Sequence, residues 1–151
     1  MDNNAPRERL VTDPAIRCAI EALIIEHAWL LDNHKSDRLG ELYVETGRMS
    51  GIGPERNGRE AIAAYGRDRA KMVQRKARHV TTNIRLLQQA PGRVSSICTI
   101  TLFRYDGDQM GTADPVALAD AEDVFVLGDD GQWRFESRHL VLRFESEAHR
   151  H

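Results

Sequence analysis

The sequence predicts an α+β domain in which three N-terminal helices pack on a strongly curved antiparallel sheet, giving a cone-shaped fold. Apolar residues in the first half of the chain recur with helical spacing, whereas the second half contains four long segments rich in β-branched and aromatic residues. Because the strands follow the helices instead of alternating with them, the helices are expected to cover one face of the sheet.

The composition is that of an ordinary globular domain. The chain has 151 residues, of which 41% are hydrophobic and 29% charged, with a formal net charge of −2. This charge gives no general attraction to nucleic acid or to anionic membranes, and no segment approaches the roughly 20 apolar residues that span a bilayer. The first nine residues lack the apolar core of a secretory signal, and Cys18 and Cys98 are interpreted as buried thiols, so a cytoplasmic protein is expected.

The first helix has a clear start signal. Residues 1–12 are polar and expected to be flexible, and Asp13 followed by Pro14 combines an N-cap with proline at the first helical position. Residues 15–31 then follow a helical pattern with few exposed polar side chains, so this helix is expected to be covered on more than one side or to line a cavity. His27 lies on its apolar stripe and is interpreted as a core histidine.

Two shorter helices are expected next. Ser36 can cap a helix that ends near Tyr43. Asn57, followed three residues later by Glu60, resembles a capping box for a third helix that is expected to run to about Arg75. The basic residues in and after this third helix are spread around it without aromatic neighbours, so they are interpreted as a solvated face and not as a nucleic-acid site: Arg67, Arg69, Lys71, Arg75, Lys76 and Arg78.

The sheet is predicted from four strands joined by turn signals. Pro91-Gly92 and the Gly-Asp-Asp-Gly run at 128–131 are expected to connect hairpins. Strands longer than the usual five or six residues make a sheet that coils, and its concave face, partly covered by helices, is a natural pocket. The domain is expected to span residues 13–145, with a disordered tail at 146–151, and its strands to span residues 78–89, 93–105, 116–127 and 133–145.

The first of these strands carries the clearest candidate site. By alternation His79, Thr81 and Asn83 share one face, which is polar and uncharged. Such a face suits the wall of a pocket, although a buried histidine satisfied by a neighbour or a surface row remains an alternative. Histidine exchanges protons near neutral pH, and Asp32 at the end of the first helix is the candidate for orienting its ring. The alternative for Asp32 is an aspartate in water.

Other polar side chains leave similar alternatives open. Tyr43 and Tyr65 face inward on their helices and could present hydroxyl groups to a carbonyl or phenol, or could be core residues. Arg138 and His139 are neighbours on the last strand, so one of them points inward, and the sequence does not decide which.

Four segments together resemble a known family. Their order and spacing are similar to the SnoaL-like branch of the nuclear-transport-factor-2-like superfamily over about residues 13–145, and they comprise residues 28–32 (AWLLD), 37–43 (DRLGELY), 58–62 (GREAI) and 78–83 (RHVTTN). The resemblance implies an α+β cone with a pocket for a small hydrophobic or aromatic ligand, in a homodimer or homotrimer. Such proteins include polyketide cyclases, scytalone-dehydratase-like enzymes, steroid isomerases and the β subunits of aromatic-ring-hydroxylating dioxygenases.

The dehydratase-like branch has an aspartate and a histidine that match Asp32 and His79, which are therefore expected to be catalytic. This implies a lyase or isomerase that needs no cofactor or metal and acts on a cyclic or aromatic ketone by His–Asp acid–base chemistry. The second histidine of that branch, on the next strand, is missing here. The alternative is a non-catalytic subunit like the dioxygenase β subunits, with a larger oxygenase partner. The residues expected to contact the substrate are Tyr43, Tyr65, Trp29, Asn83 and Phe103.

Overall fold

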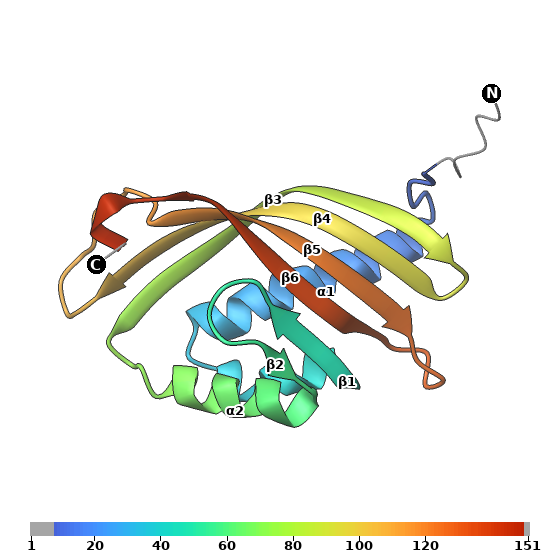
Figure 1. Cartoon of the computed structure of the whole chain (residues 1–151), viewed down its shortest axis with the longest axis horizontal. Coiled ribbons are helices and arrows are strands. Elements are labelled where there is room, and N and C mark those ends of the chain that lie inside the picture. Colours follow the sequence, from blue (N-terminus) through green and yellow to red (C-terminus); the bar gives the residue numbers. More distant parts are fainter. Residues whose placement is uncertain (1–7, 150–151) are drawn as a thin grey trace.

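The structure, a computed structural model, describes residues 8–149, in which helices pack against one mixed sheet (Figure 1). No helix among these residues is both long and apolar enough to cross a membrane. In chain order the elements are α1 (Pro14–Asp32), the 3₁₀ helix η1 (Ser36–Leu42), β1 (Tyr43–Ser50), β2 (Arg56–Asn57), α2 (Arg59–Ala70), β3 (Arg75–Ala90), β4 (Arg93–Asp106), β5 (Ala117–Leu127), β6 (Trp133–Glu145) and the 3₁₀ helix η2 (Glu147–His149).

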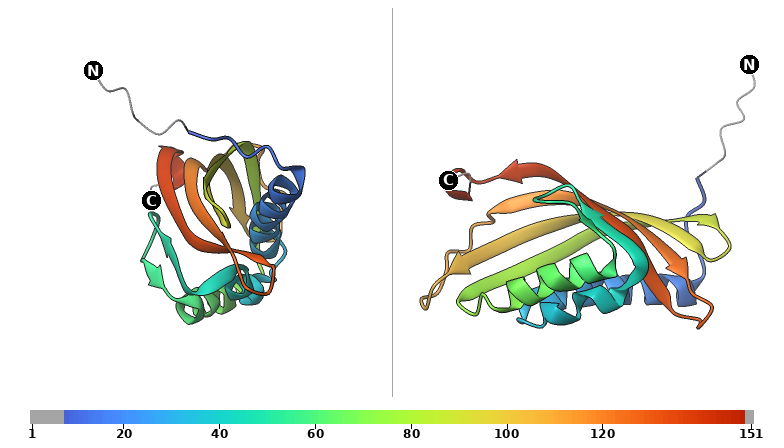
Figure 2. Two further views of the ribbon diagram at one scale, coloured as in Figure 1. Left: turned by 90° about the vertical axis from the view of Figure 1, so that its right-hand side faces the viewer. Right: turned by 60° about the horizontal axis from the view of Figure 1, so that its bottom comes forward.

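The six strands are ordered β2-β1-β6-β5-β4-β3. The four long strands form the expected antiparallel meander, with β3 at the edge. One contact in the sheet is parallel, because β1 runs in the same direction as β6, pairing Tyr43 with Phe135 and Ser50 with His139. Helices α1 and α2 lie on the same side of the sheet (Figure 2), so the site can form between them and that face. Strong curvature of the sheet stays a prediction.

The ends of the helices show where local signals hold. Asp13 caps α1 as expected, since its Oδ1 accepts the N–H of Ala15 at 2.9 Å. The predicted capping box is wrong, because Gly58 occupies the N-cap of α2 with a φ of 93° and no side-chain cap bond. Helix α2 also ends at Ala70, well before Arg75, which already pairs with β4 as the first residue of β3. Pairing between distant strands overrides local helix propensity here.

Residues near both ends of the described part make hydrogen bonds or form a helical turn. Val11 is buried and its N–H donates to the carbonyl of Leu86 at 3.0 Å, while the N–H of Gln88 donates to the carbonyl of Arg9 at 2.7 Å. Residues 9–11 therefore run beside β3. The expected disordered tail likewise includes η2, and residues 1–7 and 150–151 lie outside the described part.

The core between α1 and the sheet centres on aromatic side chains. The ring of Tyr43 stacks on Phe135 with centroids 5.0 Å apart, and Phe125 lies against Phe135 at 4.6 Å. His27 is buried beside them, and its Nε2 is 3.0 Å from the hydroxyl oxygen of Tyr43. Tyr43, expected at the end of the second helix, is instead the first residue of β1.

The two cysteines lie in different environments. Cys98 is buried in the core as expected, and burial raises the pKa of its thiol to about 11. Cys18 is exposed, so its interpretation as a buried thiol is wrong. It lies on α1, between the buried residue Ile20 and the start of the helix, on a side that the sheet does not cover.

Helix α2 packs closely against η1 at Gly66, and this contact predicts the effect of one substitution. A Cβ added at Gly66 would overlap the backbone carbonyl oxygen of Ser36, whose hydroxyl already donates to the Gly66 carbonyl at 2.8 Å. Gly66→Ala should therefore lower the free energy of unfolding by about 1–3 kcal/mol, measured by urea denaturation. In an open helix interior the same change would add about 0.5–1 kcal/mol.

Arg67→Ala, at the adjacent and exposed position of α2, is the matched control for Gly66→Ala. Because Arg67 is exposed and pairs with the exposed Glu60, the free energy of unfolding should change by less than about 0.5 kcal/mol. A Gly66→Ala variant as stable as the control would show that α2 can move away from η1 without loss.

The buried His27 makes stability depend on pH. Burial, followed by the nearby charges of Arg138 and His79, holds the pKa of His27 well below its ordinary value of 6.5. The unfolded chain binds a proton at this histidine below about pH 6.5, whereas the folded chain does not. The contribution of His27 to the free energy of unfolding should therefore be fully present above about pH 6.5. Below that pH it should decline by up to about 1.4 kcal/mol per pH unit. Urea denaturation at pH 7.5, 6.5 and 5.5 measures this slope.

His27→Gln should reduce the slope between pH 6.5 and 5.5, because the amide can still bond to Tyr43 but does not titrate. His139→Gln is the control, since His139 is exposed on the other face of β6 from the buried Arg138. An unchanged slope in His27→Gln would mean that His27 does not carry the pH dependence.

Candidate functional site

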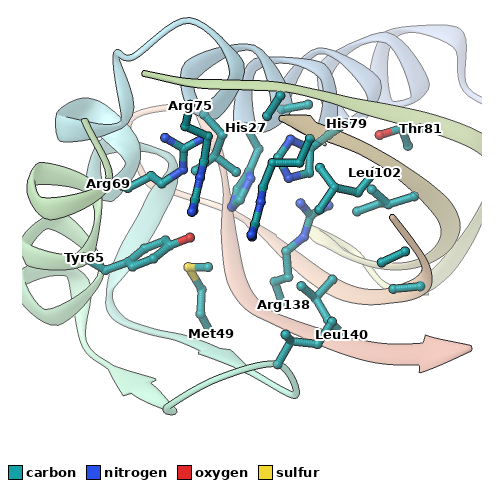
Figure 3. A pocket seen from close by; sticks show the side chains of 18 of the residues that line it. His27, Met49, Tyr65, Arg69, Arg75, His79, Thr81, Leu102, Arg138 and Leu140 are labelled. Atoms are coloured by element: carbon teal, nitrogen blue, oxygen red, sulfur yellow. The ribbon is translucent and has the colours of Figure 1, made fainter. Parts of the chain in front are cut away.

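A cavity of about 500 Å³ lies between the two α-helices and the sheet (Figure 3). Its walls come from α1, α2, β1 and all four long strands. This size suits a small organic molecule, since ligand pockets are typically about 300–1,000 Å³. Much of the lining is apolar and includes Leu31, Met49, Met72, Ile100, Leu102 and Leu140.

Asp32 and His79 meet at the edge of the sheet. β3 is the edge strand, so part of its backbone faces no neighbouring strand. The carboxylate of Asp32, the last residue of α1, uses this opening: its Oδ2 accepts the backbone N–H of His79 at 2.9 Å, and its Oδ1 lies 2.6 Å from the ring Nδ1. The Asp32 side chain is only 8% exposed, whereas His79 lines the cavity.

These two bonds determine which nitrogen of His79 is free. A carboxylate accepts hydrogen bonds, so Nδ1 carries a proton and Nε2 of the neutral ring holds the lone pair. No hydrogen bond to Nε2 is present within residues 8–149. The ring can therefore accept a proton from a molecule in the cavity.

Tyr65 and Thr81 also line the cavity. Tyr65 projects from α2, and Figure 3 shows its hydroxyl group directed into the cavity. The guanidinium of Arg56 lies 3.9 Å from the centre of the Tyr65 ring, a cation–π contact that holds the ring. Thr81 shares the face of β3 with His79, as the alternation predicts.

Three of the residues expected to contact a substrate lie outside the cavity. Trp29 is 48% exposed on the outer side of α1. Asn83 is exposed with a φ of 55°, at an irregularity in the β3–β4 register that breaks its alternation with Thr81. Phe103 points to the opposite face of β4 from Leu102, as successive strand residues do, and lines a shallower hollow beside Asp32.

Tyr43 and His27 form a buried pair next to the cavity. Tyr43 is fully buried and does not line the cavity, and burial raises the pKa of its hydroxyl well above the ordinary value. His27 is buried, as the sequence indicated, but it also lines the cavity. Its Nδ1 has no hydrogen-bond partner in the described part of the chain.

Arg138, and not His139, points inward on β6. Its guanidinium donates to both carboxylate oxygens of Asp123 at 2.8 Å, and both side chains are buried. Burial lowers the pKa of Arg138, but the charge of Asp123 outweighs it and raises the pKa above its ordinary value. His139 is exposed, with its Nδ1 2.9 Å from the hydroxyl oxygen of Ser50.

The interpretation of the basic cluster as a solvated face is wrong for two of its members. Arg69 is only 6% exposed and lines the cavity, and so does Arg75, which binds Asp106 through two hydrogen bonds of 2.8 and 2.9 Å. Burial, and then the charge of Arg75, lower the pKa of Arg69. Arg69 is four residues after Tyr65 and therefore on the same helical face, which is the signal that could have identified it.

The site thus combines a proton acceptor, a hydroxyl donor and several cations with an apolar body. No three histidine, cysteine, aspartate or glutamate side chains within residues 8–149 are grouped as a metal site requires. The arrangement suits proton transfer on a small apolar molecule that carries polar groups.

Solved structures with the same fold extend over most of the chain. A putative scytalone dehydratase from Novosphingobium aromaticivorans has 19% sequence identity and a TM-score of 0.74, covering 88% of this chain and 87% of its own. A nuclear-transport-factor-2-like protein with a cystatin-like fold from the same organism has 25% identity and a TM-score of 0.72, covering 89% and 86%. ActVI-ORFA from Streptomyces coelicolor has 18% identity and a TM-score of 0.76, covering 89% and 99%.

The family follows from the sequence match, and the fold agrees with it. No protein of curated function matches the sequence. The SnoaL-like domain matches residues 15–139, which include both α-helices, both sides of the cavity and the Asp32–His79 pair. The chain belongs to the SnoaL-like domain family.

Proposed function

We propose that this protein is a lyase or isomerase that acts on a cyclic or aromatic ketone by acid–base chemistry. His79 is the general base and removes a proton from the carbon next to the carbonyl group. Asp32 orients the ring and stabilises the imidazolium that forms. The electron pair moves from the C–H bond to the carbonyl oxygen, and the resulting enolate then takes back a proton at another carbon or expels a leaving group.

The observation that carries this proposal is the pair of hydrogen bonds between Asp32 and His79. A carboxylate that accepts both the backbone N–H and the ring Nδ1–H leaves the ring little freedom to rotate. Because Asp32 is nearly buried, its charge is poorly screened by water, so it stabilises the protonated ring more than an exposed carboxylate would. Orientation and charge support the same role, that of a base directed at the cavity.

The cavity suits the proposed substrate class. The apolar walls can surround a ring system, and the hydroxyl of Tyr65 is available to donate a hydrogen bond to the developing enolate oxygen. The hydroxyl of Tyr43 bonds to His27, and Tyr43 does not line the cavity. The description of one structural neighbour as a putative scytalone dehydratase agrees with the reaction class.

Replacing His79 tests the base directly. The probe is 1-tetralone in D₂O, whose α-protons are replaced by deuterium when a base forms the enolate, and NMR follows the loss of their signal. His79→Gln should slow the protein-dependent exchange by about 10²–10⁴-fold, because general-base catalysis contributes that much. Circular dichroism and the melting temperature establish that the variant is folded.

His139→Gln is the matched control, since this histidine is exposed outside the cavity and should leave the exchange rate unchanged. Exchange at the wild-type rate in His79→Gln would remove His79 from the mechanism. A wild-type protein with no exchange above the buffer rate would instead favour a non-catalytic subunit.

Replacing Asp32 tests the orientation of the ring. In Asp32→Asn the amide oxygen can accept the backbone N–H of His79 while the amide nitrogen donates to Nδ1, which leaves the proton on Nε2. The ring then has the wrong tautomer for a base, so exchange should fall by about 10²-fold or more. Nitrogen-15 NMR of the imidazole should show the proton moving from Nδ1 to Nε2.

An Asp32→Asn protein that retains the wild-type tautomer and rate would contradict the role given to Asp32. The combined variant Asp32→Asn with His79→Gln should be no slower than His79→Gln alone, because both changes disable the same base.

A further inference from the structure

Arg69 is a buried cation that has no partner among residues 8–149. It lies in the last turn of α2, its side chain enters the cavity beside Tyr65, and it is only 6% exposed (Figure 3). Its Nη1 is buried and has no hydrogen-bond partner in the part of the chain that the structure describes. Within residues 8–149 the guanidinium makes no ion pair, although an arginine remains charged inside a protein.

Two other arginines that line the cavity differ from Arg69 in this respect. Arg138 is neutralised by Asp123, and Arg75 is neutralised by Asp106 through two hydrogen bonds. The carboxylates of Asp123 and Asp106 are thus already bound to other cations, Asp68 pairs with Lys71, and Asp32 is bound by His79. A buried charge with no counter-ion is costly, so a group that persists in this state is expected to meet its partner in a bound molecule.

The surroundings of Arg69 indicate what that partner is. A guanidinium presents parallel N–H groups that match the two oxygens of a carboxylate. The apolar side chains of Met72 and Ile100 line the same cavity. The complement of this arrangement is an apolar ring that bears one planar anionic group.

We propose that the ligand of this cavity is a small organic acid whose carboxylate binds Arg69. Combined with the proposed function, this carboxylate site makes the substrate a cyclic or aromatic keto acid. The position of the reacting carbon rests on the proposed function. Figure 3 shows Arg69 and Tyr65 entering from α2, and His79 and Thr81 entering from β3. The carboxylate is held at the α2 side, and the carbon that loses its proton faces β3.

The test compares two probes of equal shape, 2-naphthoate and the neutral 2-naphthamide, by titration calorimetry at pH 7.5. The wild-type protein should bind the acid at least about 10-fold more tightly than the amide. Arg69→Met should weaken binding of the acid by about 10–100-fold and leave binding of the amide within about twofold. Arg67→Met, at the exposed neighbouring position that pairs with Glu60, should bind both probes like the wild type.

A second measurement separates a ligand-binding role from a structural one. Without ligand, Arg69→Met should melt at the same or a higher temperature than the wild type, because it removes an uncompensated buried charge. A lower melting temperature would mean that Arg69 supports the fold. Saturating 2-naphthoate should raise the melting temperature of the wild type and not that of Arg69→Met.

Equal affinity of the wild type for the two probes, or binding of neither at millimolar concentration, overturns the carboxylate site without any variant. This failure is distinguishable from failure of the proposed function. The deuterium exchange of 1-tetralone uses a neutral ketone and reports on His79, whereas the binding of 2-naphthoate involves no chemistry.

Discussion

The candidate site depends on one carboxylate that joins a helix to a strand. Asp32 ends α1 and accepts two hydrogen bonds from His79 on β3, one from the backbone and one from the ring. A carboxylate at the C-terminus of a helix is disfavoured by the helix dipole, so these bonds offset an intrinsic cost. The same contact closes part of the open edge of the sheet and orients the imidazole. Architecture and chemistry therefore share a single interaction.

Ion pairs decide which charges around the cavity are available to a ligand. Two arginines that face inward are each bound by two oxygens of an aspartate, so they contribute little net charge. Arg69 has no such partner, and His79 gains a positive charge only when it takes a proton. A ligand entering the cavity meets a permanent cation on α2 and a proton acceptor on β3, which suits a molecule with distinct anionic and acidic carbon ends.

Much of the fold follows from patterns within single segments. The cap at Asp13, the four strands and their hairpin turns are local features, and each is present in the structure. The pairing of Asp32 with His79 was expected from family resemblance, and the structure brings the two side chains together. The C-terminal end of α2 could not be predicted from its own sequence, because the pairing of Arg75 with Asp106 in β4 decides it. The parallel contact of β1 with β6 likewise joins segments about ninety residues apart.

The lining of the cavity was harder to predict than its existence, for a physical reason. Alternation fails wherever the register shifts, so Asn83 leaves the face that it shares with Thr81 in an ideal strand. A run of basic residues has the composition of a solvated surface, and only the packing of α2 shows that Arg69 is covered. Sequence patterns report the average environment of a residue type, and functional sites are places where a residue departs from that average.

The distance between Arg69 and the Asp32–His79 pair is set by a contact between η1 and α2 that involves none of these residues. Tyr65 and Arg69 are carried by α2, whereas the Asp32–His79 pair is carried by α1 and β3. The short 3₁₀ helix η1, which follows α1 directly, holds α2 in place through the close approach of Ser36 to Gly66. If α2 moved away from η1, the hydrogen bond from the Ser36 hydroxyl to the Gly66 carbonyl would be lost. If α2 moved closer, Gly66 would overlap the backbone of Ser36, which already leaves no room for a side chain there. The spacing between cation and base, and with it the length of the ligand, is therefore a property of the helix packing.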